Sequence, residues 1–143
     1  MQMLEKYVPD FEPDSFLQEL AGEKQVTKKE ALEICRMEVP KESYFQKKLI
    51  SGLKKQFPDA YIAKIAQGMY SQGGIPDILC ILDGHCFGFE VKRPLFGRVS
   101  RLQAAAIEKI RAAGGTAEIV SWPEEAAGII NGWRDRNGQR ETG

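Results

Sequence analysis

The sequence has few features that would cross-link a fold through disulfides or zinc, or that would anchor it in a membrane. It contains three cysteines and no Cys-x-x-Cys pair, which argues against a disulfide framework and against a structural zinc site. No apolar stretch approaches the ~20 residues of a membrane-spanning helix, and the first residues lack the apolar run of a signal peptide. We therefore expect a soluble, intracellular protein with reduced thiols and no membrane partner.

The chain also lacks net charge, yet its charges are unevenly distributed. Over 143 residues, 20 Lys+Arg balance 20 Asp+Glu. Residues 1–40 hold 5 basic and 9 acidic residues, a net charge of −4, whereas residues 41–143 hold 15 and 11, a net charge of +4. The length suits one globular domain with a real core. We expect an acidic, partly helical N-terminal appendage over 1–40, a main domain over 41–136 and a frayed tail over 137–143.

The basic residues of the main domain fall into two clusters. Such clusters are typical of a surface that binds a polyanion, although solvated helix faces give the same pattern. The first cluster comprises Lys41, Lys47, Lys48, Lys54, Lys55 and Lys64; the second comprises Lys92, Arg93, Arg98, Arg101, Lys109 and Arg111.

Helical periodicity is clearest just after residue 40. In the appendage, we expect Pro9 and Pro13 to break up any early element before a short helix over 27–37. From residue 41, apolar residues recur at helical spacing until Pro58 ends the pattern. Glu42 and Gln46 lie on its apolar side, four residues apart. A carboxylate there either complements the helix dipole or belongs to a site.

The most informative segment is a predicted β-hairpin. Two apolar runs, 77–82 and 85–92, are separated by Asp83-Gly84, which is the strongest short-range hairpin signal. With a two-residue turn, Leu82 pairs with His85 and Asp77 lies directly opposite Glu90. Strand side chains alternate between faces, so Lys92 joins these two carboxylates.

Two carboxylates that face each other on buried strands repel, so a positive charge is needed to offset their repulsion. Like charges directly opposite each other destabilise a strand pair, and both runs are apolar on both faces, as in buried central strands. A divalent cation bound to oxygen ligands would compensate them, and Mg²⁺ suits a site with two carboxylates better than Ca²⁺ or Zn²⁺. An exposed ion pair between Glu90 and Lys92 is the alternative.

The rest of the chain completes an α/β pattern. We expect a strand over 61–66, a loop over 67–76, a helix through Ala113, a strand over 116–121 and a last helix from Pro123. Ser100 and Gln103 form a capping box at the start of the helix that ends at Ala113. The residues expected to face inward on that helix are Leu102, Ala106, Ile110 and Ala113.

Three other reactive side chains are assigned structural roles. The only histidine, His85, falls beside the turn and on the face opposite Asp77, so we interpret it as a turn residue. Cys80 and Cys86 point to opposite faces in the same register and are expected to fill the core.

Several motifs in order resemble a known nuclease family. Pro76-Asp77 and, after twelve intervening residues, Glu90-Val91-Lys92 resemble the signature of the PD-(D/E)xK superfamily. The wider series resembles the VRR-NUC domain in its free-standing phage and bacterial form, over about residues 41 to 125. The other motifs in the series are Glu42-x3-Gln46, Gly73-Gly74-Ile75-Pro76-Asp77, Phe89-Glu90-Val91-Lys92-Arg93-Pro94, Ser100-x2-Gln103 and Ala113-Gly114-Gly115.

The resemblance implies a fold, a location and site residues. The fold would be a restriction-endonuclease-like core with a small mixed central sheet flanked by helices, in the cytoplasm of a bacterial or phage-infected cell. Metal ligands would be Glu42, Asp77, Glu90 and the Val91 carbonyl, and Lys92 would orient the attacking water. The accessory residues are Gln46 and Gln103, and the DNA contacts are Lys47, Lys48, Arg93, Arg98 and Arg101.

The expected activity is Mg²⁺- or Mn²⁺-dependent hydrolysis of DNA phosphodiesters, and the resemblance implies that it leaves 5′-phosphate ends. No recognition segment beyond the compact domain is evident, which favours structure-specific cutting of branched, junction or flap DNA over cutting by a restriction enzyme. Two arms of a junction require two sites, so a homodimer is expected. The alternative is a DNA-binding module with the same fold that does not cut; basic clusters would supply phosphate affinity in both cases.

Overall fold

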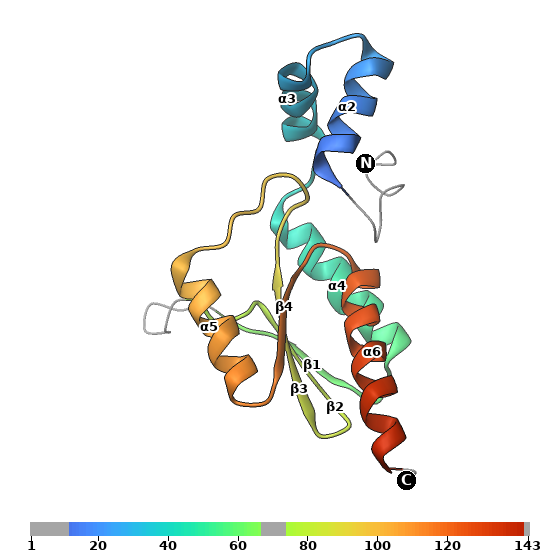
Figure 1. The fold of residues 1–143 in the computed structure, drawn as a ribbon, viewed down its shortest axis with the longest axis vertical. Coiled ribbons are helices and arrows are strands. Elements are labelled where there is room, and N and C mark those ends of the chain that lie inside the picture. The colour runs from blue at the N-terminus through green and yellow to red at the C-terminus, as the bar shows by residue number, and fades with distance from the viewer. Residues whose placement is uncertain (1–11, 67–73, 142–143) are drawn as a thin grey trace.

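The computed structural model describes residues 12–66 and 74–141. Within them, one four-stranded sheet lies between helices, with α4 (Glu42–Gln56) and α6 (Pro123–Glu141) over one face and α5 (Arg101–Ala112) over the other (Figure 1). Helices α2 (Pro13–Lys24) and α3 (Lys28–Glu38) form a hairpin beyond one end of the sheet. The α/β class and the small mixed sheet flanked by helices are confirmed.

The sheet has the order β1-β2-β3-β4 and mixed strand directions. Strands β1 (Tyr61–Lys64), β2 (Ile78–Leu82) and β3 (His85–Val91) pair antiparallel, and β4 (Thr116–Val120) runs parallel to β3. The parallel pair needs a crossover connection, which α5 provides. Strands β2 and β3 are therefore central, as their apolar faces predict.

The β2–β3 hairpin has the predicted register. Leu82 pairs with His85 and Ile78 with Phe89. Asp83 and Gly84 have φ values of 53° and 75°, and a two-residue hairpin turn of this left-handed kind matches the twist of the strands. Asp77 immediately precedes β2, and this register places it next to Glu90 on β3. The predicted loop residues 67–73 lie outside the described residues.

Helix α4 packs its apolar side against the sheet and α6. Phe45, Leu49 and Leu53 are fully buried, and the Phe45 ring meets the buried Trp122 ring edge-on at 5.4 Å. The helix therefore carries the predicted apolar stripe, and its first turn projects toward the end of the sheet where β2 begins and β3 ends.

Helix α5 begins with the predicted capping box but is rotated relative to the expected inward face. Ile107 is its buried residue, whereas Leu102 is 62% exposed and Ala113 is exposed. Gln103, Ile107 and Ile110 share the inward side because they are four and three residues apart. This rotation turns Gln103 toward β3.

The appendage is more helical than the sequence predicts. Pro13 does not break an early element; it occupies the first turn of α2, where its missing N–H has no partner to lose. Glu12 caps the helix by accepting hydrogen bonds from the backbone N–H of Asp14 and Ser15. Phe16 and Leu20 are buried, so α2 and α3 pack together.

The expected frayed tail from residue 137 is wrong at its start, because α6 continues to Glu141. The Asn137 side chain donates a hydrogen bond to the carbonyl of Trp133, one turn earlier, and so adds a bond to this part of the helix. Across the described ranges, no helix is both long and apolar enough to cross a membrane.

Candidate metal centre

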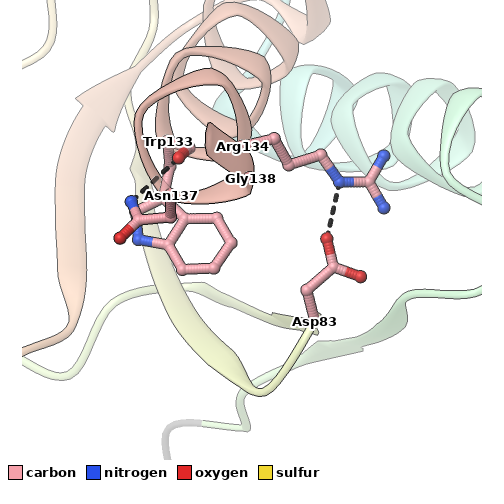
Figure 2. A pocket seen from close by; sticks show the side chains of 5 residues that line it. All are labelled: Asp83, Trp133, Arg134, Asn137 and Gly138. Atoms are coloured by element: carbon pink, nitrogen blue, oxygen red, sulfur yellow. Dashed lines mark hydrogen bonds and ion pairs between the residues drawn. The ribbon is translucent and has the colours of Figure 1, made fainter. Parts of the chain in front are cut away.

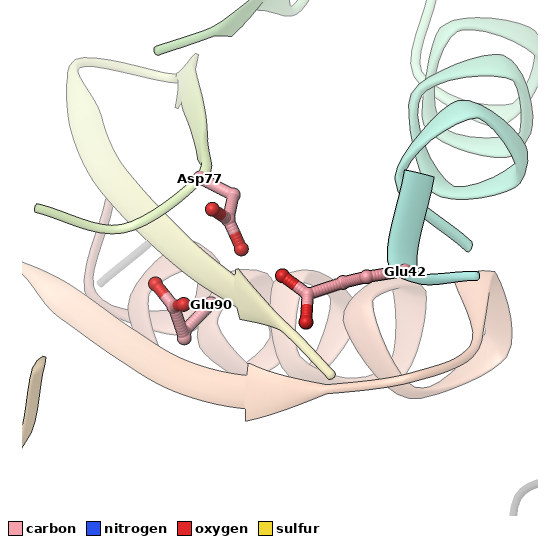
Figure 3. A group of neighbouring side chains, drawn as sticks. All are labelled: Glu42, Asp77 and Glu90. Atoms are coloured by element: carbon pink, nitrogen blue, oxygen red, sulfur yellow. The ribbon is translucent and has the colours of Figure 1, made fainter. Parts of the chain in front are cut away.

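Three carboxylates converge at one end of the sheet. Glu42 comes from the first turn of α4, Asp77 from the residue before β2, and Glu90 from the penultimate position of β3. One oxygen from each lies within 4.8 Å of the others, and Figure 3 shows the three side chains directed toward a common space. The convergence predicted for Asp77 and Glu90 is confirmed, and Glu42, whose helical spacing alone left two roles open but which the resemblance implied as a metal ligand, joins them.

Glu90 is the most enclosed of the three. Its side chain is 1% exposed. Its Oε1 accepts a hydrogen bond from Gln103 Nε2 at 2.6 Å and lies 3.5 Å from Lys92 Nζ. Its Oε2 is buried, with no hydrogen-bond partner in the part of the chain that the structure describes. A buried carboxylate oxygen without a partner is costly, so this atom calls for a ligand.

Asp77 is fixed by the backbone of the opposite strand. Its Oδ2 accepts a hydrogen bond from the Val91 N–H at 2.9 Å, and its own carbonyl accepts one from the Ile65 N–H at 2.7 Å. The carboxylate is thus held level with Glu90 rather than turned to solvent. The Val91 carbonyl remains a predicted metal ligand; it is the N–H of Val91 that contacts Asp77.

Lys92 is held beside this cluster by both backbone and packing. Its N–H donates to the Val120 carbonyl at 2.9 Å, and its own carbonyl accepts from Ser121 Oγ at 2.7 Å. Its side chain is only 12% exposed. A Cβ placed on Gly97 would lie 2.4 Å from the Cβ of Lys92, so only glycine allows the loop to pack closely against the lysine side chain. The exposed ion pair considered from sequence is instead buried.

The electrostatics of the cluster favour a cation. Burial, with the charge of Asp77 second, raises the pKa of Glu90 to about 7. Burial also raises the pKa of Glu42, which Lys92 partly opposes. It is costly for all three carboxylates to be charged in a partly dehydrated site. A divalent cation that prefers oxygen ligands would offset their repulsion, with Glu90 Oε2 as one of its ligands. The donor set therefore fits Mg²⁺ or Mn²⁺.

The two glutamines predicted as accessory residues lie near the cluster in different ways. Gln103 uses both ends of its amide: Oε1 accepts from the Ser100 N–H at 2.9 Å, and Nε2 donates to Glu90. The Gln103 side chain can therefore cap α5 and contact Glu90 at the same time. Gln46, one turn after Glu42, is 9% exposed and lines a cavity that also contains Asp77.

The predicted DNA-contacting residues differ in their surroundings. Arg93 donates hydrogen bonds at 2.9 Å to the carbonyls of Val39 and Pro40 and lies over the Phe96 ring. Much of its guanidinium is thus engaged within the protein, which sequence reasoning missed because the partners are more than fifty residues away. Lys48 lies over the Tyr44 ring. Lys47, Arg98 and Arg101 are exposed and remain predicted contacts.

A second cavity, of about 440 Å³, lies at the opposite end of the hairpin (Figure 2). It is lined by Asp83, Trp133, Arg134, Asn137 and Gly138, and Asp83 and Arg134 form an ion pair at 2.8 Å. None of the three site carboxylates lines it.

His85 and the strand cysteines have packing roles in the structure. His85 stacks on Trp133 at 4.3 Å and hydrogen-bonds through Nε2 to Thr116 Oγ1 at 2.8 Å. Cys80 is buried, and burial raises its thiol pKa to about 11, so the thiol remains protonated and unreactive. Cys86 is half-buried. These contacts agree with the structural roles expected from the sequence.

Comparison with known proteins gives one relevant similarity. No family model and no curated protein matches the chain. A solved structure described as "VRR_NUC domain" is similar to it, with 25% sequence identity and a TM-score of 0.49, covering 63% of this chain and 94% of that chain. Likeness at this TM-score does not decide function, which must be inferred from the site.

Proposed function

We propose that this protein is a metal-dependent nuclease that hydrolyses DNA phosphodiester bonds. The observation that carries the proposal is the buried, unpartnered Oε2 of Glu90, close to the carboxylates of Asp77 and Glu42 and beside the ammonium of Lys92. A protein that only bound DNA would gain nothing from three carboxylates near a polyanion, because they repel phosphate.

Glu42, Asp77 and Glu90 would hold the cation, with the Val91 carbonyl as a further ligand. When bound, Mg²⁺ or Mn²⁺ would polarise the scissile phosphate and lower the pKa of a coordinated water. The carboxylates would also fix the position of the phosphate relative to Lys92, since the hydrogen bond from the Val91 N–H holds Asp77 and the bond from Gln103 holds Glu90.

Lys92 would orient the attacking water and oppose the negative charge that develops on the phosphate. Its ammonium lies beside Glu90, and the close approach of Gly97 confines the base of its side chain. A charge held in fixed geometry in a partly dehydrated site stabilises a transition state without reorganisation at the moment of reaction.

The substrate would be branched, junction or flap DNA, bound through the exposed basic residues Lys47, Arg98 and Arg101. Backbone contacts of this kind position DNA without reading its sequence. A homodimer would present two such sites to the arms of one junction. Sedimentation with and without branched DNA tests this part, and a strict monomer under both conditions would overturn it.

Cleavage of labelled branched and linear DNA in Mg²⁺, Mn²⁺ or EDTA tests the proposed activity. We expect cleavage with either metal, none with EDTA, and a loss of at least a hundredfold in Glu90→Gln and Lys92→Ala. Equal activity in the wild type and both variants would remove the assignment. Tight DNA binding without cleavage in any metal would favour the non-catalytic DNA-binding module.

A further inference from the structure

A cavity of about 450 Å³ adjoins the carboxylate cluster. Its lining comes from α4 and from the segment at and just after the end of β1, and it shares Asp77 with the cluster. The volume lies within the roughly 300–1,000 Å³ typical of small-molecule sites. The lining residues are Gln46, Lys64, Ile65, Ala66 and Asp77.

Gln46 is the residue in this cavity that points to a ligand. It is 9% exposed and lines the cavity. Within residues 12–66 and 74–141 the fully buried side-chain atom without a partner is Glu90 Oε2, so the amide of Gln46 is not sealed in the core but opens into the cavity. A polar amide that faces a cavity is available to donate and accept hydrogen bonds to a bound molecule. Because Gln46 follows Glu42 by one helical turn, both side chains lie on the same side of α4.

We propose that this cavity is a subsite for a single unpaired nucleoside of the DNA strand, next to the phosphate that is cut. The inference rests on the proposed function, whose site shares Asp77 with the cavity. The amide of Gln46 can donate and accept, as a base edge or sugar hydroxyl requires. Ile65 and Ala66 offer an apolar wall for the base, and the ammonium of Lys64 offers a counter-charge for a flanking phosphate.

The charges lining the cavity make nucleotide binding depend on the cation. Asp77 repels phosphate and Lys64 attracts it, so the two charges oppose each other when Asp77 carries no metal. A cation held by Asp77 removes the repulsion and leaves the attraction of Lys64. A nucleoside monophosphate should therefore bind more tightly when a divalent cation is present.

A subsite for one unpaired nucleoside also defines the substrate class. A paired base must leave the helix to enter the cavity, and that step is least costly where the base is already unpaired. Flaps and single-stranded branches should therefore be cut faster than continuous duplex of the same sequence, by about tenfold or more.

The test compares Gln46→Leu with Gln56→Leu, which replaces the same residue type at an exposed position at the far end of α4. Cleavage of a flap and of a matched duplex is measured with Mn²⁺, together with the melting temperature and Mn²⁺ affinity of each variant. We expect Gln46→Leu to reduce the flap-to-duplex rate ratio to near one without a fall in melting temperature or Mn²⁺ affinity. Gln56→Leu should keep the wild-type ratio. An unchanged ratio in Gln46→Leu would overturn the subsite and leave the nuclease proposal standing.

A binding measurement separates the two proposals if no DNA is cut. Thymidine 5′-monophosphate is titrated into the wild type, Gln46→Leu and Lys64→Met, with and without Ca²⁺, and followed by amide chemical shifts. We expect Ca²⁺ to tighten binding and each variant to weaken it severalfold. Absence of cleavage with this binding pattern would overturn the nuclease proposal alone, whereas nucleotide binding that neither variant changes would overturn the subsite.

Discussion

The guanidinium of Arg93 donates a hydrogen bond to the carbonyl of Pro40 at 2.9 Å, and a second one to Val39 at the same distance. Arg93 directly follows Lys92, and Pro40 lies two residues before Glu42. This contact ties the segment just after β3 to the start of α4. The contact therefore couples the position of Glu42 to the position of Lys92.

Arg93→Gln should loosen the metal centre as well as the fold. Two carbonyls lose a charged donor, which should lower the free energy of unfolding by about 1.5–3 kcal/mol. Mn²⁺ affinity should fall about tenfold, as for other residues that orient metal ligands. Denaturant unfolding and Mn²⁺ titration measure the two effects. The exposed Arg98→Gln should change neither, and a defect of Arg93→Gln confined to DNA affinity would contradict this role.

The metal-free protein should lose stability as the pH rises. The pKa of Glu90 is raised to about 7 from an ordinary value of 4.5. Its protonated form thus supports the fold fully below about pH 4.5, and that support is lost as the pH rises through about 7. At about 1.4 kcal/mol per pH unit of separation between unfolded and folded pKa, the loss is roughly 3 kcal/mol.

Urea unfolding in EDTA from pH 4.5 to 8 measures this loss. Glu90→Gln should flatten the profile, because its amide cannot ionise and can donate a hydrogen bond toward Asp77. The difference between the two profiles reports Glu90 together with the carboxylate that interacts with it, Asp77. Parallel profiles would show that Glu90 is not the group responsible.

Gly97→Ala should impair catalysis through Lys92. The added methyl group would lie 2.4 Å from the Cβ of Lys92, and a displacement of about 1 Å in a reacting group can reduce kcat about a hundredfold. Mn²⁺ affinity should stay near the wild-type value. Single-turnover cleavage measures the effect, and adding Gly97→Ala to Lys92→Ala should cause no further loss.

Gly128→Ala is the matched control for this change. It also replaces a glycine, but no atom lies within 4 Å of the new Cβ. Since Gly128 lies within α6, alanine there should stabilise the protein by about 0.5–1 kcal/mol and leave cleavage unchanged. Full activity in Gly97→Ala would show that the loop containing residue 97 can shift to accommodate the methyl group without moving Lys92.

Ser100→Ala and Gln103→Ala should separate capping from the site contact. Ser100→Ala removes one capping hydrogen bond, at a cost of about 0.5–2 kcal/mol, and leaves the bond from Gln103 to Glu90. Gln103→Ala removes the other capping bond, from the Ser100 N–H to Oε1 of Gln103, together with the bond to Glu90. It should therefore reduce cleavage severalfold more than Ser100→Ala at a comparable melting temperature. Equal cleavage rates would assign Gln103 to capping alone.

The hairpin could be predicted because the residues that determine its turn and register are close together in the sequence. Asp83-Gly84 fixes the turn, the turn fixes the register, and the register brings Asp77 to Glu90. Lys92 follows from strand alternation. The signals for this part of the site all lie within sixteen consecutive residues, 77–92, so no tertiary contact had to be known.

The remaining parts of the site depend on tertiary packing. Glu42 could equally have served the helix dipole, and only the placement of α4 against the sheet brings its carboxylate to Asp77. From the sequence, Arg93 is interpreted as a DNA contact like the other basic residues. Nothing local indicates that its partners are backbone carbonyls of the α3–α4 connection. The inward face of α5 was predicted only in part: Ile110 is partly buried as expected, whereas Leu102 and Ala113 are exposed, because the angle at which the helix docks on the sheet is set by tertiary packing.

The most direct measurement is calorimetric titration with Mn²⁺ of the wild type and of the Asp77→Asn/Glu90→Gln double variant at neutral pH. We predict saturable binding to the wild type, weakened by a factor of about ten or more in a double variant that is still folded. Equal binding to both proteins, or no binding to the wild type, would contradict a metal centre at these carboxylates.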